Sequence, residues 1–362
     1  MTAPSFEARL TELWDRVQSN EESAEAKKQI LNESDELLAN QDFTANPFFV
    51  AKLKLIMFKA GKIIKLDELA QEFDSFAKRE PSIDVLICLA ETYLHDQQAE
   101  KAISPLEYAQ TLGENADVLI LLSLCYRRME QKDYKKSLAY AKKAVELNMK
   151  YGKAWSNYGI ALLSIAGREN IVQASKAFKF AIANGQQNNA DVMVNYGTVQ
   201  ELLLNFMESM KCYENAIRIA GNWAVALESL NRIQTRLNNV MTRVDMIHKI
   251  RPAKRTKLLQ RVTHDDEYLV VETPFPKDDP SQIVLCMNKA GEIFAFGVIK
   301  TMRAYLLPEK TVIKIAVPEF SKLEINGKSI NYFIIEDQRK AQLIHSATPA
   351  NVDPVSISST IA

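Results

Sequence analysis

The sequence predicts a mainly helical chain with a C-terminal β domain: a solenoid of helical hairpins followed by a small antiparallel barrel. The first observation is a repeat, because Ile83-Asp-Val-Leu-Ile-Cys-Leu-Ala90 is echoed 33 positions later by Ala116-Asp-Val-Leu-Ile-Leu-Leu-Ser123. The second is a helix with regularly spaced small residues after each copy. The third is a change of composition, because short alternating runs of Val, Ile, Phe and Tyr dominate from Tyr268 onward.

The second helix of each hairpin carries a small residue, an apolar residue or alanine four positions on, and alanine three further. Small side chains let two helices approach closely, and the bulkier residue fills the space toward the next repeat. The repeat length is close to the 34 residues typical of tetratricopeptide repeats. In chain order the positions are Ala102, Leu106 and Ala109; Ser137, Ala141 and Ala144; Ala174, Phe178 and Ala181; Ser209, Tyr213 and Ala216.

The domain organisation follows from these patterns. We expect a solenoid over residues 1–250, begun by capping helices near 6–18 and 22–40, because the exposed end of a solenoid needs a polar outer face. After it we expect a basic linker (251–266), an OB-type domain (267–347) and a disordered tail (348–362). Within the solenoid, the expected repeats and closing helix are 48–79, 83–113, 116–148, 152–185, 190–220 and 222–249.

The C-terminal domain is predicted from short strand patterns separated by turn residues. Asn326-Gly327, between Leu323–Ile325 and Lys328–Ile330, is a strong hairpin signal. An OB-type barrel fits five to seven strands in about 85 residues. OB folds commonly bind oligonucleotides, but alternation favours a core position over base stacking for most of the aromatic residues, which are Phe294, Phe296, Tyr305, Tyr332 and Phe333.

Composition narrows the class of protein. Lys plus Arg equals Asp plus Glu at 45 each, so net charge predicts no partner. No apolar run approaches the roughly 20 residues that span a bilayer, so we expect a soluble intracellular protein without a membrane partner. The four cysteines are widely spaced, which favours reduced core thiols over disulfides or zinc. Because phosphate-binding, dinucleotide and zinc-protease motifs are missing, we expect no enzyme, no cofactor and no metal.

The first candidate site is the face of the first helices, which commonly line the concave surface of such a solenoid. Asn157 and Asn195 are equivalent positions, two residues after Trp155 and Met193. Because a carboxamide donates and accepts at once, these asparagines could hold a peptide backbone. The alternative is an ordinary solvated face. The expected face comprises Asp117, Arg127, Lys153, Ser156, Asn157, Asp191, Asn195, Thr198 and Glu201.

Two residues of this face carry opposite charges two repeats apart. Arg127 and Asp191 are too distant in the repeat array to pair with each other, so they favour a ligand that carries both a negative and a positive charge. The alternative for each is a local surface salt bridge, which contributes little. A chaperone co-factor that grips a C-terminal carboxylate is a further alternative, with Lys153 near Asn157, but Asp191 beside Asn195 opposes it.

The second candidate site is the basic run from His248 to Arg261, which contains no acid. Such a density of cations attracts phosphate backbones, with salt-dependent affinity. A solvated linker or a nuclear import signal at Lys254–Lys257 are the alternatives. The residues expected to contact a polyanion are Lys249, Arg251, Lys254, Arg255 and Lys257.

Over residues 65–347 the chain resembles the family of Strap, the stress-responsive tetratricopeptide co-factor also known as tetratricopeptide repeat protein five. The repeats, the basic junction and the barrel occur in that family's order. The matching segments are Leu122-Ser-Leu-Cys-Tyr-Arg127, Asn189-Ala-Asp191 with Asn195, Phe294-Ala-Phe-Gly297, Val317-Pro-Glu319 and Asn326-Gly-Lys328.

The resemblance implies one of two functions. Family members in the cytoplasm bind the N-terminal Met-Arg-Glu of nascent tubulin at the ribosome and trigger tubulin mRNA decay, with an mRNA-decay adaptor downstream. In the nucleus they are described as scaffolds for an acetyltransferase co-activator in the stress response, with the barrel touching DNA. The resemblance therefore implies a cytoplasmic and nuclear adaptor.

The resemblance also implies roles for particular residues. Arg127 would meet the glutamate of the peptide, and Asp191 would meet its arginine. Lys254, Arg255 and Lys257 would contact ribosomal RNA. The family's second acidic contact falls on Val225, and Glu228, one turn away, is the residue that could replace it.

Overall fold

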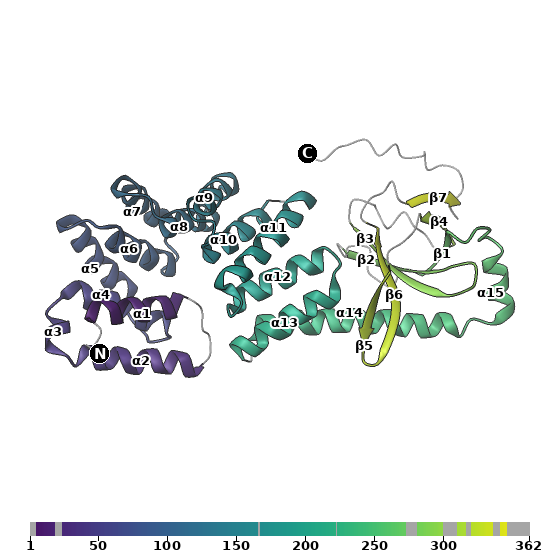
Figure 1. Ribbon diagram of the computed structural model, residues 1–362, viewed down its shortest axis with the longest axis horizontal. Coiled ribbons are helices and arrows are strands. Elements are labelled where there is room, and N and C mark those ends of the chain that lie inside the picture. The colour runs from purple at the N-terminus through teal and green to yellow at the C-terminus, as the bar shows by residue number, and fades with distance from the viewer. Residues whose placement is uncertain are drawn as a thin grey trace. The chain divides into compact units, whose positions relative to one another are not determined.

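The protein divides into two compact units in the computed structural model (Figure 1). Unit 1 consists of Met1–Val199 and Lys211–Leu227, and unit 2 of Gln200–Met210 and Glu228–Ala362. The division therefore passes through the last helical hairpin and the helix after it. The structure describes residues 5–18, 24–165, 167–221, 223–272, 281–299, 310–315, 320–335 and 341–345.

The helices form successive antiparallel hairpins, as Figure 1 shows for α4 to α11. Helix α8 begins at Ala116, 33 residues after α6 begins at Ile83, which is the predicted repeat length. The helices are α1 (Phe6–Gln18), α2 (Ala24–Leu38), α3 (Gln41–Thr44), α4 (Pro47–Lys59), α5 (Leu66–Arg79), α6 (Ile83–His95), α7 (Ala99–Leu112), α8 (Ala116–Arg128), α9 (Tyr134–Leu147), α10 (Gly152–Leu163), α11 (Arg168–Ala181), the π-helix η1 (Ile182–Gln186), α12 (Ala190–Leu202), α13 (Phe206–Ala220), α14 (Ala224–His248) and α15 (Pro252–Leu259).

Local sequence explains where the first helices of the hairpins begin. Asn46 caps α4, Ser82 caps α6 and Asn115 caps α8, each through a side-chain oxygen that accepts a backbone N–H of the first turn. Such caps satisfy donors that a helix leaves unpaired at its start, and each contributes about 1 kcal/mol. Helix α10 has no side-chain cap. Its first residue, Gly152, instead lies so close to the η1 backbone that a Cβ there would collide with the Asn184 carbonyl.

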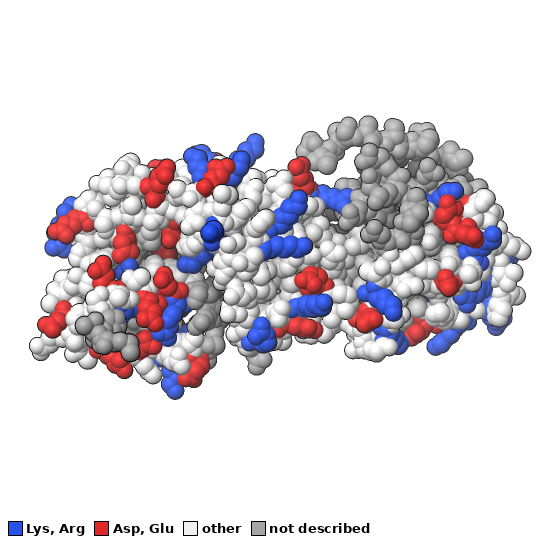
Figure 2. Space-filling model, viewed as in Figure 1, with Lys and Arg blue, Asp and Glu red and all other residues white. Residues whose placement is uncertain are grey.

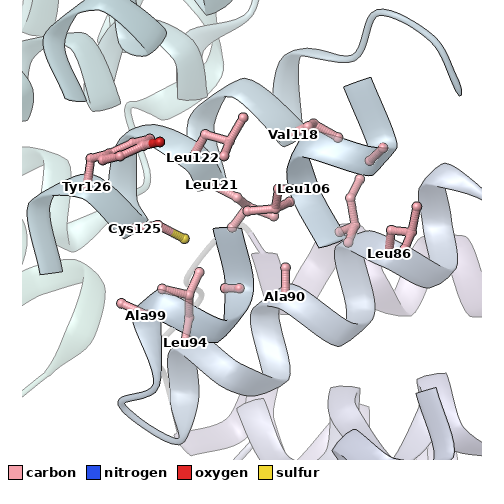
Figure 3. Close-up of a cluster of buried hydrophobic side chains, with 13 residues drawn as sticks. Leu86, Ala90, Leu94, Ala99, Leu106, Val118, Leu121, Leu122, Cys125 and Tyr126 are labelled. Atoms are coloured by element: carbon pink, nitrogen blue, oxygen red, sulfur yellow. The ribbon is translucent and has the colours of Figure 1, made fainter. Parts of the chain in front are cut away.

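The predicted packing of small residues is confirmed. All twelve positions of the small-apolar-alanine pattern in α7, α9, α11 and α13 have 0% exposure. Figure 3 shows how one repeat is completed by the next, because side chains of α6, α7 and α8 point into a shared apolar cluster. The labelled members are Leu86, Ala90, Leu94, Ala99, Leu106, Val118, Leu121, Leu122, Cys125 and Tyr126.

Residue size is matched between the two helices of a hairpin. In the third repeat Gly159 faces Phe178, and a Cβ on the glycine would lie 2.9 Å from the ring. In the fourth repeat Gly197 faces Tyr213, with a corresponding distance of 2.7 Å. Only glycine leaves room for these aromatic rings, so the two positions are fixed by packing and not by backbone conformation.

The four cysteines are free and buried, as expected for core thiols. Burial raises the pKa of the Cys125 thiol to about 12, so it stays protonated at neutral pH. Among the described residues, no group of three or more His, Cys, Asp or Glu is arranged to hold a metal ion. No helix in the described part of the chain is long and apolar enough to cross a membrane.

The C-terminal part of unit 2 is one mixed seven-stranded sheet in the order β5-β6-β3-β2-β1-β4-β7. Asn326 and Gly327 both have positive φ (50° and 74°), as a type I′ turn requires, which confirms the predicted hairpin between β5 and β6. The strands are β1 (Glu267–Glu272), β2 (Ser281–Met287), β3 (Ile293–Ile299), β4 (Val312–Ile315), β5 (Ser321–Ile325), β6 (Lys328–Ile335) and β7 (Ala341–His345).

The expectation of an antiparallel barrel needs correction. β3 and β6 pair in parallel, with Phe296 opposite Phe333, so the sheet is mixed. Among the described strands, β5 and β7 are the two edges of an open sheet. The local strand patterns were right, but pairing between strands that are distant in sequence depends on which faces pack together, and alternation alone carries no information about it.

The aromatic residues of the sheet lie in the core, as alternation predicted. Phe294, Phe296, Tyr332 and Phe333 are each at most 5% exposed, which removes them as base-stacking surfaces. Phe296 and Phe333 stack with ring centroids 5.5 Å apart. Tyr305, Val317-Pro-Glu319 and the tail from 348 lie outside the described residues.

The turn between α12 and α13 packs against the sheet within unit 2. Leu204, at the turn, has a positive φ of 64° and is fully buried. The Tyr332 hydroxyl donates to the backbone carbonyl of Leu204 at 3.2 Å. The rings of Phe206 and Tyr332 lie 6.0 Å apart. A left-handed conformation strains a leucine, and the surrounding contacts hold it in place.

Candidate functional site

The strongest candidate site centres on Arg127, in the last turn of α8. Its guanidinium is half-buried and donates to the hydroxyls of Ser123 (3.2 Å) and Ser137 (3.3 Å) and to the carboxamide oxygen of Asn157 (3.2 Å). These partners come from α8, α9 and α10, so two adjacent repeats position one cation. All three partners are neutral, and among the described residues Arg127 forms no ion pair.

The partners of Arg127 are themselves fixed. Ser123 and Ser137 are fully buried, and their hydroxyl oxygens lie 3.1 Å apart. Asn157 is 5% exposed, and its Nδ2 has no hydrogen-bond acceptor among the described residues. An unsatisfied buried donor costs about 1–3 kcal/mol, so a ligand acceptor beside Arg127 and Asn157 would be stabilised by two donors.

Burial lowers the pKa of Arg127 to about 10, and the adjacent positive charge of Arg128 adds to the shift. The group is still charged at neutral pH, so the fold holds a partly desolvated cation with no counter-charge among the residues that the structure describes. Such an arrangement costs stability, because a buried charge is normally paired. A site that gives up stability in this way is a candidate for binding an anion.

The fourth repeat provides an internal comparison. Glu201 is eight residues after Met193, as Arg127 is eight after Leu119, so the two occupy equivalent positions. Glu201 is 9% exposed and is paired with Arg232 at 2.8 Å and Arg236 at 3.2 Å. The buried charge of the fourth repeat is thus neutralised within the protein, whereas Arg127 of the second repeat has no acidic partner in the described part of the chain. Glu201, expected on the binding face, serves as an internal counter-ion.

The other predicted peptide contacts have different surroundings. Asn195 is half-buried and its Nδ2 donates to the backbone carbonyl of Asp191 at 2.8 Å. Asp191 is half-buried at the start of α12. Asn157 and Asn195 are equivalent in the repeat, but one bonds to Arg127 and the other to its own helix. Glu228 is exposed.

A second polar cluster lies in unit 1, on α8 and the start of α10. The Tyr151 hydroxyl donates to Asp117 at 2.6 Å. Burial, followed by repulsion from Asp117, raises the pKa of Tyr151, so the phenol stays protonated. Burial lowers the pKa of Lys153, and attraction to Asp117 and Glu91 opposes the shift. Ser156 donates to the Lys153 backbone carbonyl at 2.9 Å, and the Lys153 side chain is the cation of this cluster.

The predicted polyanion contacts divide into two kinds. Lys249, Arg251, Lys254 and Lys257 are exposed, and Figure 2 shows basic side chains gathered over α15. Arg255 is half-buried and donates to the carbonyl of Gly291, so it joins α15 to the turn between β2 and β3. The segment expected as a linker therefore contains a helix that is fixed to the sheet by Arg255 and presents the other cations to solvent.

The sequence analysis missed Ser123 and Ser137 as site residues. Ser137 belongs to the small-residue pattern of the second repeat, and Ser123 ends the repeated segment of the first helix, so neither gave a reason to expect a polar role. A signal was available, because the other three repeats have Ala90, Gly159 and Gly197 where this one has Ser123. A hydroxyl at a position that packing reserves for a small apolar residue needs a hydrogen-bond partner.

An open hollow of about 820 Å³ also lies along α1 in unit 1. Its lining contains none of the predicted site residues and comes from one helix, so it lacks the converging polar groups of a built site. The lining residues are Ser5, Glu7, Ala8, Thr11, Glu12, Asp15 and Arg16.

Fold and site together define a class: a solenoid of tetratricopeptide-type helical hairpins. Stacked helical hairpins form extended binding surfaces, and this one carries a half-buried cation that lacks an anionic partner among the described residues. No family model and no curated protein matches the chain.

Several solved structures are similar to the chain. One is a chain of the APC/C hetero-tetramer Cut9–Hcn1, with a TM-score of 0.49 and 14% identity over 61% of this chain and 42% of that chain. Another is YrrB, a TPR protein with an unusual peptide-binding site. Its TM-score is 0.36, with 18% identity over 60% of this chain and 96% of that chain. A third is TTC0263, a thermophilic TPR protein in Thermus thermophilus. Its TM-score is 0.38, with 18% identity over 48% of this chain and 90% of that chain. At these TM-scores the likenesses carry no argument about the function of the chain.

Proposed function

We propose that the protein is a non-enzymatic adaptor that binds the N-terminal Met-Arg-Glu of nascent tubulin at the ribosome and promotes co-translational decay of tubulin mRNA. The observation that carries this proposal is the half-buried Arg127, whose described partners are all neutral. A glutamate carboxylate would supply the missing counter-charge. The unsatisfied Nδ2 of Asn157 would donate to the same ligand.

Two further features support a ligand with both charge signs. Asp191 stands two repeats after Arg127 and is the acidic residue assigned to the arginine of the peptide. The cluster of Lys153, Asp117 and Tyr151 lies on α8 and at the start of α10, and it contains both signs. A peptide with adjacent arginine and glutamate side chains, which point to opposite sides of an extended backbone, suits separated subsites of opposite charge.

In this proposal the exposed cations of α15 contact ribosomal RNA. Arg255 fixes α15 to the sheet, so Lys254 and Lys257 project from a rigid element and not from a flexible linker. Two weak contacts on one chain, one with the peptide and one with RNA, would give a combined affinity that neither has alone. The OB-type identity of the sheet domain and a cytoplasmic and nuclear distribution stay predictions. An mRNA-decay adaptor is the expected downstream partner.

The peptide proposal is tested by titration with synthetic peptides. We expect the protein to bind a peptide that begins Met-Arg-Glu, and to bind the same peptide with Glu→Gln at least tenfold more weakly, because the charge at Arg127 would go unmatched. A peptide with an acidic C-terminus is the control for a carboxylate-clamp chaperone co-factor. Equal affinity for the Glu and Gln peptides would contradict the proposal. Fractionation with chromatin instead of ribosomes would favour the nuclear scaffold for an acetyltransferase co-activator.

The RNA contact makes a separate prediction. For binding to an RNA duplex, the logarithm of the affinity should fall linearly with the logarithm of salt concentration, and replacing Lys254 and Lys257 by alanine should reduce that slope by roughly 1–2. Both lysines are exposed, so stability should not change. Arg255→Ala is the matched control. It removes the bond to Gly291, so we expect it to lower the stability of the protein and to leave the salt slope nearly unchanged. An unchanged salt slope in the double variant would contradict the proposed RNA contact of Lys254 and Lys257.

A further inference from the structure

A rigid aromatic surface at the junction of α9, α10 and α11 has no role in the proposed function. We define the aromatic patch as Met149, Trp155 and Phe180. The rings of Trp155 and Phe180 stack with centroids 4.8 Å apart and planes inclined by 24°. The Trp155 indole N–H donates to the Met149 carbonyl at 2.7 Å. The three residues are thus joined although they come from a loop and two helices.

The outer members of the aromatic patch are exposed. Met149 is 70% exposed and Phe180 51%. Two more large apolar side chains of the neighbouring helices are exposed, Val172 (37%) two turns before Phe180 on α11 and Leu147 (40%) at the end of α9. A single exposed apolar residue needs no explanation, but a joined group of aromatic and aliphatic side chains marks an interaction site.

The backbone on both sides of the aromatic patch is fixed. The Asn184 side chain donates to the Phe180 carbonyl at 2.7 Å and so holds the end of α11. Gly152, at the start of α10, leaves no room for a Cβ against the Asn184 carbonyl, which holds the helix of Trp155 against the same turn. A surface that is already ordered loses little entropy on binding, and aromatic anchors of this kind dominate many interfaces.

The margin of the aromatic patch is basic. Lys176 is one turn before Phe180 on α11, Lys179 adjoins Phe180, and Lys150 adjoins Met149. All three lysines are exposed, and in the described part of the chain none of them forms an ion pair. The nearby acid Glu146 is paired with Lys142 at 3.6 Å. The charge that the surface offers to a partner is therefore positive.

We propose that the aromatic patch docks an acidic amphipathic helix of a protein partner. Val172 and Phe180 lie about 12 Å apart along α11, given the rise of 1.5 Å per residue, and leucines at i and i+7 of a partner helix have a similar spacing. Those leucines would cover Val172 and Phe180, and glutamates beside them would face the lysines. The aromatic patch contains none of the predicted peptide contacts, so its proposal does not depend on the proposed peptide site.

The test uses a synthetic helix and the full chain. The probe is a fluorescein-labelled, acetylated and amidated peptide with leucines at i, i+4 and i+7 and glutamates elsewhere, and the control probe has lysines in place of glutamates. By fluorescence anisotropy we expect the acidic probe to bind at least tenfold more tightly than the basic one, and to bind more weakly as salt is raised. Equal binding of the two probes would overturn the proposal.

Matched variants then locate the site. We expect the affinity for the acidic probe to fall about tenfold in Phe180→Ala. The same loss is expected in the double variant Lys176→Glu with Lys179→Glu. Tyr108→Ala, which removes a ring that is 45% exposed on α7, and Lys101→Glu on the same helix should leave the affinity unchanged. Thermal unfolding checks that each variant folds. Unchanged affinity in Phe180→Ala would overturn the proposal. So would a dimer in sedimentation velocity that Phe180→Ala dissociates, because the occupant would then be a second copy of the chain.

Discussion

Replacing Arg127 by methionine should abolish binding of a Met-Arg-Glu peptide while leaving the fold about as stable as before. Methionine has a similar length and no charge, so it removes a partly desolvated cation whose described partners are three neutral groups. Removing the partly desolvated charge favours the fold, and the loss of a donor to the buried Asn157 oxygen costs about 1–3 kcal/mol, so we expect the two effects roughly to cancel. The lost contact with the peptide carboxylate should cost about 2–4 kcal/mol of binding, or roughly 30- to 700-fold in affinity.

Two further variants separate charge from geometry. Arg127→Lys keeps the positive charge but cannot donate to Ser123, Ser137 and Asn157 together, so its affinity should fall between wild type and Arg127→Met. Arg128→Ala removes the adjacent exposed arginine and should leave affinity within about twofold. Calorimetric titration gives the affinities, and urea unfolding the stabilities. If Arg127→Met lost more than about 2 kcal/mol of stability, the arginine would be a structural residue and not a ligand site.

The second large effect is expected on stability, from Gly297→Ala in β3. A Cβ at this position would lie 2.6 Å from a methyl carbon of Leu204 and closer still to the hydroxyl of Tyr332. Both neighbours are buried, and the hydroxyl donates to the Leu204 carbonyl, so neither can move without losing contacts. Overpacking of a core costs about 1–3 kcal/mol, and disturbing a buried hydrogen bond adds about 1 kcal/mol. We expect a loss of about 2–4 kcal/mol in urea unfolding.

A double-mutant cycle tests the cause. Tyr332→Phe deletes the hydroxyl that meets the new Cβ, so the variant with both changes should be more stable than the sum of the single effects predicts, by about 0.5–2 kcal/mol. Gly327→Ala is the matched control, because its φ of 74° strains a side chain but no atom lies within 4 Å of the Cβ position. It should cost only about 1 kcal/mol. Additive effects of Gly297→Ala and Tyr332→Phe would show that the clash is not with the hydroxyl.

Arg127 shows how much of the site the sequence could predict. Repeat spacing placed it eight residues after Leu119, on the face expected to bind, and its charge made it a candidate. Whether such a residue is paired cannot be read from spacing, because its partners come from different helices. Glu201 illustrates this, since it occupies the equivalent position and is paired with Arg232 and Arg236. Ser123 and Ser137, which accept hydrogen bonds from the guanidinium, lie in the repeated segment and in the small-residue pattern, where packing alone accounts for a small side chain.

The sequence by itself determined the repeat and its hairpins. Helix periodicity, caps such as Asn115 and the small-apolar-alanine positions act over a few residues, and all twelve of those positions are fully buried as predicted. Asn326-Gly327 likewise specified its turn locally. Tertiary structure decided the parallel pairing of β3 with β6, the role of Arg255 as a joint between α15 and the sheet, and the absence of a described counter-charge for Arg127. Each of these depends on residues that are distant in the chain and meet only when the elements pack, whereas periodicity describes one element at a time.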